Sequence, residues 1–252
     1  GLVDLGYDLV DARNYVVAAC WEFIIPGVGM DIPNIGALSF PKVVDVCLHR
    51  DLESCKDFPT FMTKVRSEVS NQVHQITAQF NNLFMEPAPF MSLLMTGCVE
   101  QARDVSLGAK YNNFGLHGTG LAVAADSLAA IRKYVFEEKA VSATELIKAV
   151  DCNFQGYEGL LAKLKFEAPK MGNDDDCVDT IACDLLNMFA DSLAGMKNER
   201  GGCYRAGTGS AMYYLWHAKE LGASPNGRLR GEPLPANYSP SLGVRVKGPI
   251  SL

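Results

Sequence analysis

The chain has no Cys-x2-Cys pair and only four histidines, none at a ligand spacing from another. Its eight cysteines are irregularly spaced, and the closest two, Cys177 and Cys183, are six residues apart. Structural zinc and iron–sulfur sites need such ligands at close, repeated spacings. The sequence therefore predicts no metal site, and cysteines this sparse indicate reduced thiols in a cytoplasmic protein, not a disulfide scaffold.

Long apolar runs and an excess of positive charge are also missing. No apolar run approaches the ~18 residues of a membrane span, and the first ten residues contain no basic side chain and no cleavage-site pattern. The formal net charge of −6 disfavours nucleic acid and anionic membranes as partners. Because 48% of the 252 residues are hydrophobic, the chain can bury a large core, and we expect a soluble, enzyme-like protein.

Short apolar segments alternate with long amphipathic ones, which predicts an α/β fold. We expect a strand over residues 14–20, a loop rich in glycine and proline over 26–36, and a helix over 37–50. The longest expected helix covers residues 58–84. Its apolar side chains recur at steps of three and four, which indicates one buried stripe.

Another helix is expected over residues 90–107, followed by a strand over 111–114. The glycines of 115–120 and 207–209 are not spaced as in nucleotide-binding loops, so both segments are predicted to be strand-to-helix turns. Acidic residues at 174–176 come just before a helix expected to begin near residue 177. They are expected to cap that helix and not to bind a metal ion.

Cys20 and Glu22 place a thiol and a carboxylate two residues apart. In an extended backbone such residues point to the same side, so both are expected to face one cavity while Trp21 faces the wall behind. A second pair, Cys98 and Glu100, lies in an expected helix, where residues two apart diverge by ~200°. Cys98 is therefore predicted to be a packing residue, and Cys20 and Glu22 are the candidate catalytic residues for sulfur chemistry and proton transfer.

Further motifs accompany the cysteine in a fixed order along the chain. They are Tyr111-Asn112-Asn113-Phe114-Gly115, Gly172-Asn173-Asp174-Asp175, Tyr204-Arg205-Ala206-Gly207-Thr208-Gly209-Ser210, Ser239-Pro240 and Gly248-Pro249. Together with Cys20 and Glu22, this series resembles the glycyl radical enzymes of the pyruvate formate-lyase superfamily. The resemblance extends over nearly all of the chain.

The resemblance implies a ten-stranded barrel of two five-stranded half-sheets, wrapped by helices, with the cysteine loop at its centre. Residues 1–252 would belong to a single catalytic domain and supply the C-terminal half of the barrel. The N-terminal half and the glycine radical domain, with its Arg-Val-x-Gly-Tyr motif, are expected to be absent from this sequence. Arg245-Val246-Lys247-Gly248 matches that motif only until Pro249 breaks it, so Gly248 is expected to be a turn residue.

In that family a radical passes from a distant glycine to the loop cysteine, which corresponds to Cys20. The resulting thiyl radical abstracts hydrogen from a carbon of the small-molecule substrate. Glu22 resembles the general base of the family's dehydratases and lyases, which predicts elimination across a C–O, C–N or C–S bond. Ala19 stands where pyruvate formate-lyase has a second cysteine, so formate acetyltransferase activity is disfavoured. Asn237 and Ser239 are expected to contact substrate at the rim of the site.

Two alternatives remain open at the level of sequence. Arylacetate decarboxylases also pair a cysteine with a glutamate, and the chain could instead be a non-catalytic half-barrel remnant. The resemblance further implies that no cofactor binds this chain itself. The glycyl radical would be installed by an S-adenosylmethionine radical enzyme with an iron–sulfur cluster, and the full-length protein would be a homodimer in anaerobic cytoplasm.

Overall fold

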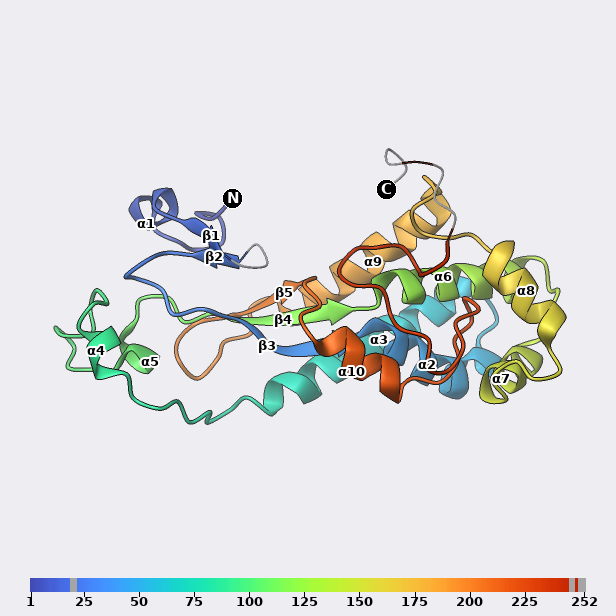
Figure 1. The fold of residues 1–252 in the computed structure, drawn as a ribbon, viewed down its shortest axis with the longest axis horizontal. Helices are drawn as coiled ribbons and strands as arrows, with labels where there is room; N and C mark the ends of the chain where they lie inside the picture. The colour runs from blue at the N-terminus through green and yellow to red at the C-terminus, as the bar shows by residue number, and fades with distance from the viewer. Residues whose placement is uncertain (19–21, 245–247, 249–252) are drawn as a thin grey trace. The chain divides into compact units, whose positions relative to one another are not determined.

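A computed structural model describes residues 1–18, 22–244 and 248 of the chain (Figure 1). The backbone divides into two compact units, each made of three segments. The first unit comprises Gly1–Gly36, Thr77–Leu116 and Leu193–Gly207, and the second comprises Ala37–Ile76, His117–Ser192 and Thr208–Leu252. Within the described residues, no helix is both long and apolar enough to cross a membrane.

The first unit contains short helices and two sheets. Its elements are α1 (Leu9–Arg13), β1 (Val16–Ala18), β2 (Glu22–Ile24), α4 (Pro89–Ser92), α5 (Val105–Gly108), β5 (Tyr204–Gly207) and the first residues of β3 (Ile32–Ser39) and β4 (Phe114–Thr119). Strands β1 and β2 form an antiparallel pair, and the other sheet has the strand order β3-β4-β5. The chain contains both helices and strands, and helical segments within residues 40–108 and 121–193 separate β3, β4 and β5 in the sequence, which agrees with the expected α/β fold.

The turn predicted over residues 115–120 is only partly confirmed, because Gly115 and Gly118 lie inside strand β4, whereas Gly120, with a φ of 68°, connects β4 to α6. A Cβ atom on Gly115 would lie 2.2 Å from the carbonyl oxygen of Pro33, and one on Gly36 would lie 2.9 Å from the ring of Phe80. Gly115 therefore allows β3 and β4 to pack closely, and Gly36 in β3 leaves room for the Phe80 ring. The expected loop over residues 26–36 is also partly wrong, because its last five residues belong to β3, which begins at Ile32.

The expected helix over residues 90–107 is also wrong. Only α4 and α5 are helical there, and the backbone between them adopts positive φ at Gly97 (90°) and Ala102 (50°), which interrupts a right-handed helix. The side chain of Asp104 caps α5 and also accepts hydrogen bonds from Ala88 N at 2.7 Å and Ser92 Oγ at 2.9 Å. Cys98 is nevertheless buried, as predicted, and packs against Met95, Val105 and Ala109.

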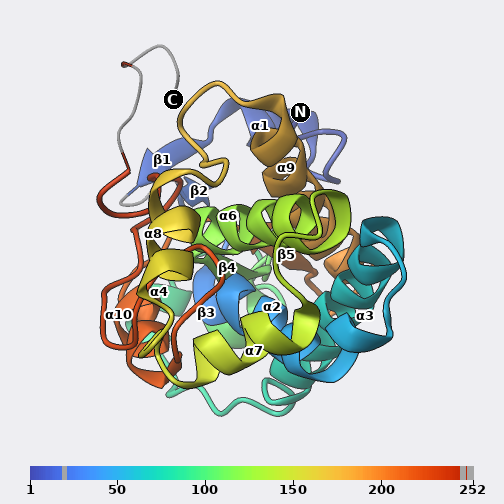
Figure 2. The same cartoon turned by 90° about the vertical axis from the view of Figure 1, so that its right-hand side faces the viewer.

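The second unit is mainly helical. Its elements are α2 (Phe40–Asp51), a 3-10 turn (Leu52–Ser54), most of α3 (Phe58–Ala78), α6 (Leu121–Ile131), a π-helical turn (Arg132–Glu137), α7 (Ala143–Asp151), α8 (Glu158–Phe166), most of α9 (Asp176–Leu193) and α10 (Tyr213–Glu220). Helix α6 is buried along its whole length and lies between α2 and α9 in both views (Figures 1 and 2). An edge-to-face contact between the rings of Phe40 and Phe189, whose centroids are 5.8 Å apart, joins α2 to α9.

Two local predictions for this unit are confirmed. The apolar stripe of α3 is buried at Phe61, Val65, Val69 and Val73, although the helix ends at Ala78, six residues before the predicted end. The acidic run also starts a helix, because Asp175 accepts hydrogen bonds from backbone amides of the first turn of α9. Local hydrophobic period and capping chemistry thus determine both elements.

Candidate active site

Glu22 is the first residue of β2 and lies directly opposite Ala18 in the hairpin. Because β1 and β2 are antiparallel, the chain reverses direction between these two residues. The strand expected over residues 14–20 is confirmed for Val16–Ala18. Cys20 lies between the strands, outside the described residues, whereas Glu22 is half-buried. The common orientation expected for Cys20 and Glu22 therefore stays a prediction.

The helix that precedes the hairpin is held by charged hydrogen bonds. Lys110 donates to Asp11 Oδ2 at 2.7 Å and also bonds to Asp8, and the hydroxyl of Tyr111 donates to Asp11 Oδ2 at 2.8 Å. The hydrogen bond from Lys110, followed by that from Tyr111, lowers the pKa of Asp11. These bonds attach α1 to the segment just before β4, since charged partners form the stronger hydrogen bonds.

Tyr7 is the centre of a polar network in the first unit, and its side chain is only 3% exposed. Its hydroxyl donates to Asp31 Oδ2 at 3.1 Å and accepts from Asn113 Nδ2 at 3.2 Å and Arg205 Nη1 at 2.8 Å. Burial, and then the nearby Asp31 carboxylate, raise the pKa of Tyr7 to about 12. Tyr7 therefore stays protonated at neutral pH. Its hydroxyl links the segments that contain Asp31, Asn113 and Arg205.

Two of the sequence motifs, residues 111–115 with Asn113 and residues 204–210 with Arg205, meet at this network. Asn113 Oδ1 accepts hydrogen bonds from both the backbone nitrogen and the thiol of Cys203, each at 3.1 Å, and Phe114 N donates to the carbonyl of Cys203 at 2.9 Å. Pairing of β4 with β5 brings Asn113 beside Arg205. Both motifs can be recognised in the sequence, whereas Tyr7 and Asp31 cannot, because no local pattern marks either residue.

Asn237 and Ser239 belong to the second unit. The side-chain oxygen of Asn237 accepts from the backbone nitrogen of Ser210 at 2.9 Å and from its hydroxyl at 3.2 Å. Asn237 has a φ of 51°, and Ser239 N donates to the carbonyl of Ala236 at 3.0 Å. The Asn237 side chain thus attaches its loop to Ser210, which follows the turn after β5. Ser239 is exposed.

A histidine provides another titratable group in the second unit. His217 Nδ1 lies 2.7 Å from the hydroxyl oxygen of Thr119, and burial lowers the pKa of His217. A neutral imidazole at this position orients the end of β4 against α10. No three histidine, cysteine, aspartate or glutamate side chains in the described part of the chain are grouped to hold a metal ion.

The family model for pyruvate formate lyase-like proteins matches residues 1–216. Since this match covers most of the chain, the chain belongs to the pyruvate formate lyase-like family. Trans-4-hydroxy-L-proline dehydratase of Clostridioides difficile is 36% identical over 277 residues, covering 100% of this chain and 34% of that protein. Indoleacetate decarboxylase of Tractidigestivibacter scatoligenes is 28% identical over 294 residues, covering 99% of this chain and 33% of that protein.

The fold also matches a solved structure. The glycerol-bound form of the B12-independent glycerol dehydratase from Clostridium butyricum has a TM-score of 0.91 and 29% sequence identity, covering 99% of this chain and 34% of that one. The chain therefore spans about a third of the length of the relatives it matches.

Proposed function

We propose that this chain is the part of a glycyl radical dehydratase or lyase that contains the radical-bearing cysteine, Cys20, and its proton-transfer partner, Glu22. The main supporting observation is the position of Glu22 at the start of β2, opposite Ala18, in the hairpin whose connection contains Cys20. Similarity to dehydratases over the full length of the chain supports the same reaction class.

In this proposal residues 1–252 form part of a single catalytic domain in a cytoplasmic protein. The β3-β4-β5 sheet would belong to a ten-stranded barrel that is completed by the rest of the full-length protein. The hairpin exposes several apolar side chains, as the inner loop of such a barrel would before enclosure. These are Tyr15, Val16, Val17, Phe23 and Ile24.

A glycyl radical elsewhere in the full-length homodimer, installed by an S-adenosylmethionine radical enzyme, would supply the unpaired electron. As a thiyl radical, Cys20 takes a hydrogen atom from the substrate carbon that bears a hydroxyl group. The Glu22 carboxylate takes the proton of that hydroxyl, and the resulting carbonyl radical anion expels the neighbouring hydroxide. Glu22 returns its proton to the leaving group, which departs as water, and the product radical recovers a hydrogen atom from the Cys20 thiol.

The same scheme applies to an amine or sulfite leaving group, because only the second bond to break differs. In trans-4-hydroxyproline the hydroxyl is itself the leaving group, so the hydrogen atom is taken from the carbon beside the ring nitrogen, and Glu22 accepts the proton of that nitrogen instead. Its geometry requires Cys20 and Glu22 to be held close to one substrate. The network around Tyr7 and the charged anchor at Asp11 fix the segment that leads into the hairpin. Asn237 and Ser239 are kept in this proposal only as residues of the site's rim, since the Asn237 side chain already bonds to Ser210.

Arylacetate decarboxylation is the second candidate, favoured by the similarity to an indoleacetate decarboxylase. Decarboxylation releases carbon dioxide and leaves any hydroxyl in place, so the products distinguish the two reactions.

The full-length protein should be activated anaerobically and offered trans-4-hydroxyproline, glycerol, isethionate and indoleacetate. Loss of water or sulfite is the expected result. Release of carbon dioxide from indoleacetate alone would replace elimination by decarboxylation. An activated protein that carries the glycyl radical but turns over none of the four would favour the non-catalytic remnant.

A further inference from the structure

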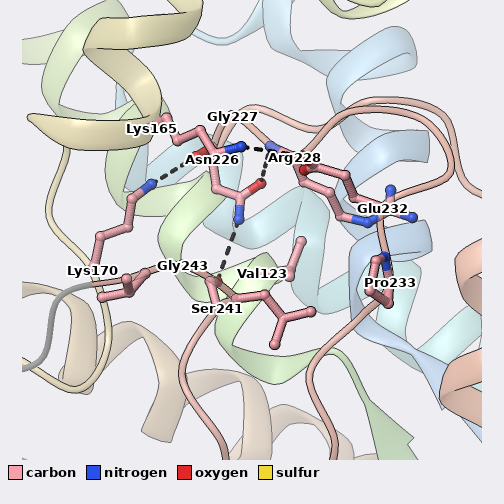
Figure 3. A pocket seen from close by; sticks show the side chains of 12 residues that line it. Val123, Lys165, Lys170, Asn226, Gly227, Arg228, Glu232, Pro233, Ser241 and Gly243 are labelled. Carbon is pink, nitrogen blue, oxygen red and sulfur yellow. Dashed lines mark hydrogen bonds and ion pairs between the residues drawn. The ribbon is translucent and has the colours of Figure 1, made fainter.

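The second unit contains a cavity of about 290 Å³ whose wall carries several charged side chains (Figure 3). Helix α8 provides Lys165, and the loop after it provides Lys170. The opposite wall is the loop that contains Asn226, Arg228 and Glu232. Three cationic side chains thus share the cavity with one carboxylate.

Lys170 is unusually buried for a lysine, with 7% of its surface exposed. Its ammonium group donates to the carbonyl oxygens of Leu164 and Asn226, both at 2.8 Å. An ammonium has three N–H groups, so one of them has no acceptor among the described residues. Burial lowers the pKa of Lys170 to about 8, against the opposing effect of the Asp126 carboxylate.

Arg228 is equally buried, at 5% exposed. Two of its N–H groups donate to the carbonyl oxygens of Gly222 and Ala218, at 2.8 and 3.0 Å. Its Nε, however, has no hydrogen-bond partner within the described part of the chain. A buried donor without an acceptor is uncommon, because it loses its bond to water and gains nothing in return. A bound anion would supply the missing acceptor.

The cavity wall contains an ion pair between Lys165 and Glu232, at 3.2 Å, with 34% and 40% of the two side chains exposed. Gly227 lies against Lys165, where a Cβ atom would come within 2.9 Å of the Lys165 Cβ and 3.0 Å of its backbone, and its φ is 91°. The glycine therefore keeps the loop close to α8, and Glu232 is the negative charge that competes for Lys165.

We propose that this cavity binds a small anion that carries a carboxylate or phosphate group. The volume lies at the lower end of ordinary ligand pockets, which are ~300–1,000 Å³, so it suits a small metabolite. Lys170 and Arg228 provide buried donors and Lys165 provides a partly exposed charge. The Asn226 amide, which donates to Ser241, and the Ser241 hydroxyl, which donates to Asp126, complete a polar wall. The proposal does not depend on the reaction proposed for Cys20, because it concerns binding alone.

Calorimetric titration of the full-length, unactivated protein tests the site, with inorganic phosphate and succinate as separate probes at constant ionic strength in chloride. Saturable binding of one ion per chain is expected for at least one probe. The probe that binds more tightly distinguishes a phosphate from a carboxylate ligand. The proposal would be overturned if neither probe binds. This includes the case in which an acidic side chain of the protein itself fills the cavity.

Three variants make the test specific. Lys165→Met should weaken binding about fivefold, whereas Glu232→Gln should tighten it by a similar factor, because it removes the competing charge. Lys163→Met is the matched control, since Lys163 is a partly exposed residue of the same helix that does not line the cavity. Equal effects of Lys165→Met and Lys163→Met, or weaker binding in Glu232→Gln, would rule out this cavity as the site. Thermal unfolding of each variant verifies that it is folded.

Discussion

Arg205 donates a hydrogen bond of 2.8 Å to the hydroxyl oxygen of Tyr7, although 198 positions separate the two residues. The guanidinium also lies over the Tyr7 ring, 4.7 Å from its centroid. Tyr7 comes just before α1 and the β1–β2 hairpin, so strand β5 helps to position the segment that leads to Glu22. Because several partners bond to the single hydroxyl of Tyr7, a substitution of this one residue tests whether the network stabilises the segment before the hairpin.

Tyr7→Phe should lower the free energy of unfolding of the full-length protein by about 1–3 kcal/mol, because Asp31, Asn113 and Arg205 each lose a buried partner. Urea denaturation measures the change. Tyr15→Phe removes the hydroxyl of an exposed tyrosine in the same unit and should leave stability unchanged. Equal stability of the two variants would show that the Tyr7 network contributes little.

Cys20→Ser should abolish turnover of the activated full-length protein while its glycyl radical signal persists, because an alcohol O–H is too strong to replace the thiol. Cys98→Ser should retain most activity, since Cys98 is buried among Met95, Val105 and Ala109. Electron paramagnetic resonance together with product assays separates radical formation from catalysis. Near-normal turnover in Cys20→Ser would refute the assignment.

Glu22→Gln should reduce kcat by at least about 100-fold, the ordinary contribution of a general acid–base group. The amide keeps the size of the side chain but cannot accept the substrate's proton. Glu100→Gln, in the other Cys-x-Glu segment, is the matched control and should retain activity. Unchanged kcat in Glu22→Gln would remove proton transfer from its role.

Gly115→Ala should destabilise the protein by about 3 kcal/mol, because the new methyl group would overlap the backbone of Pro33. Gly159→Ala meets no atom within 4 Å and lies in α8, where alanine is favoured over glycine by about 0.5–1 kcal/mol. Thermal unfolding of the two variants should therefore shift in opposite directions. A stable Gly115→Ala protein would contradict the close approach of β3 and β4.

Asp126 should make stability depend on pH in the acidic range. It is fully buried, and burial raises its pKa to about 6 from 3.8. Its contribution is complete below the unfolded pKa and is lost as the pH rises through about 6, at a cost of about 2–3 kcal/mol.

Asp126→Asn should therefore be less sensitive than the wild type to a change from about pH 4 to pH 7. Urea denaturation at several pH values measures the difference, with Asp184→Asn at an exposed position of α9 as the control. Parallel pH profiles for the wild type and Asp126→Asn would disprove the effect.

Sequence patterns predicted the parts of the fold that depend on near neighbours. The α3 stripe follows from the helical period, and the start of α9 follows from acidic caps. The helix expected over residues 90–107 failed because Gly97 and Ala102 adopt positive φ while Asp104 bonds back to Ala88 and Ser92. The glycines of β4 failed as turn markers because glycine equally permits close contact between strands.

The candidate site divides in the same way. The order of motifs around Cys20 and Glu22 determined the family from the sequence alone, because each motif is a short local string. Only the tertiary structure decided that Tyr7 meets Arg205, that the chain reverses direction between Ala18 and Glu22, and that Lys170 lies beside Asn226. These contacts join residues that strand pairing and loop packing bring together from distant positions, and neighbouring residues in the sequence do not specify them.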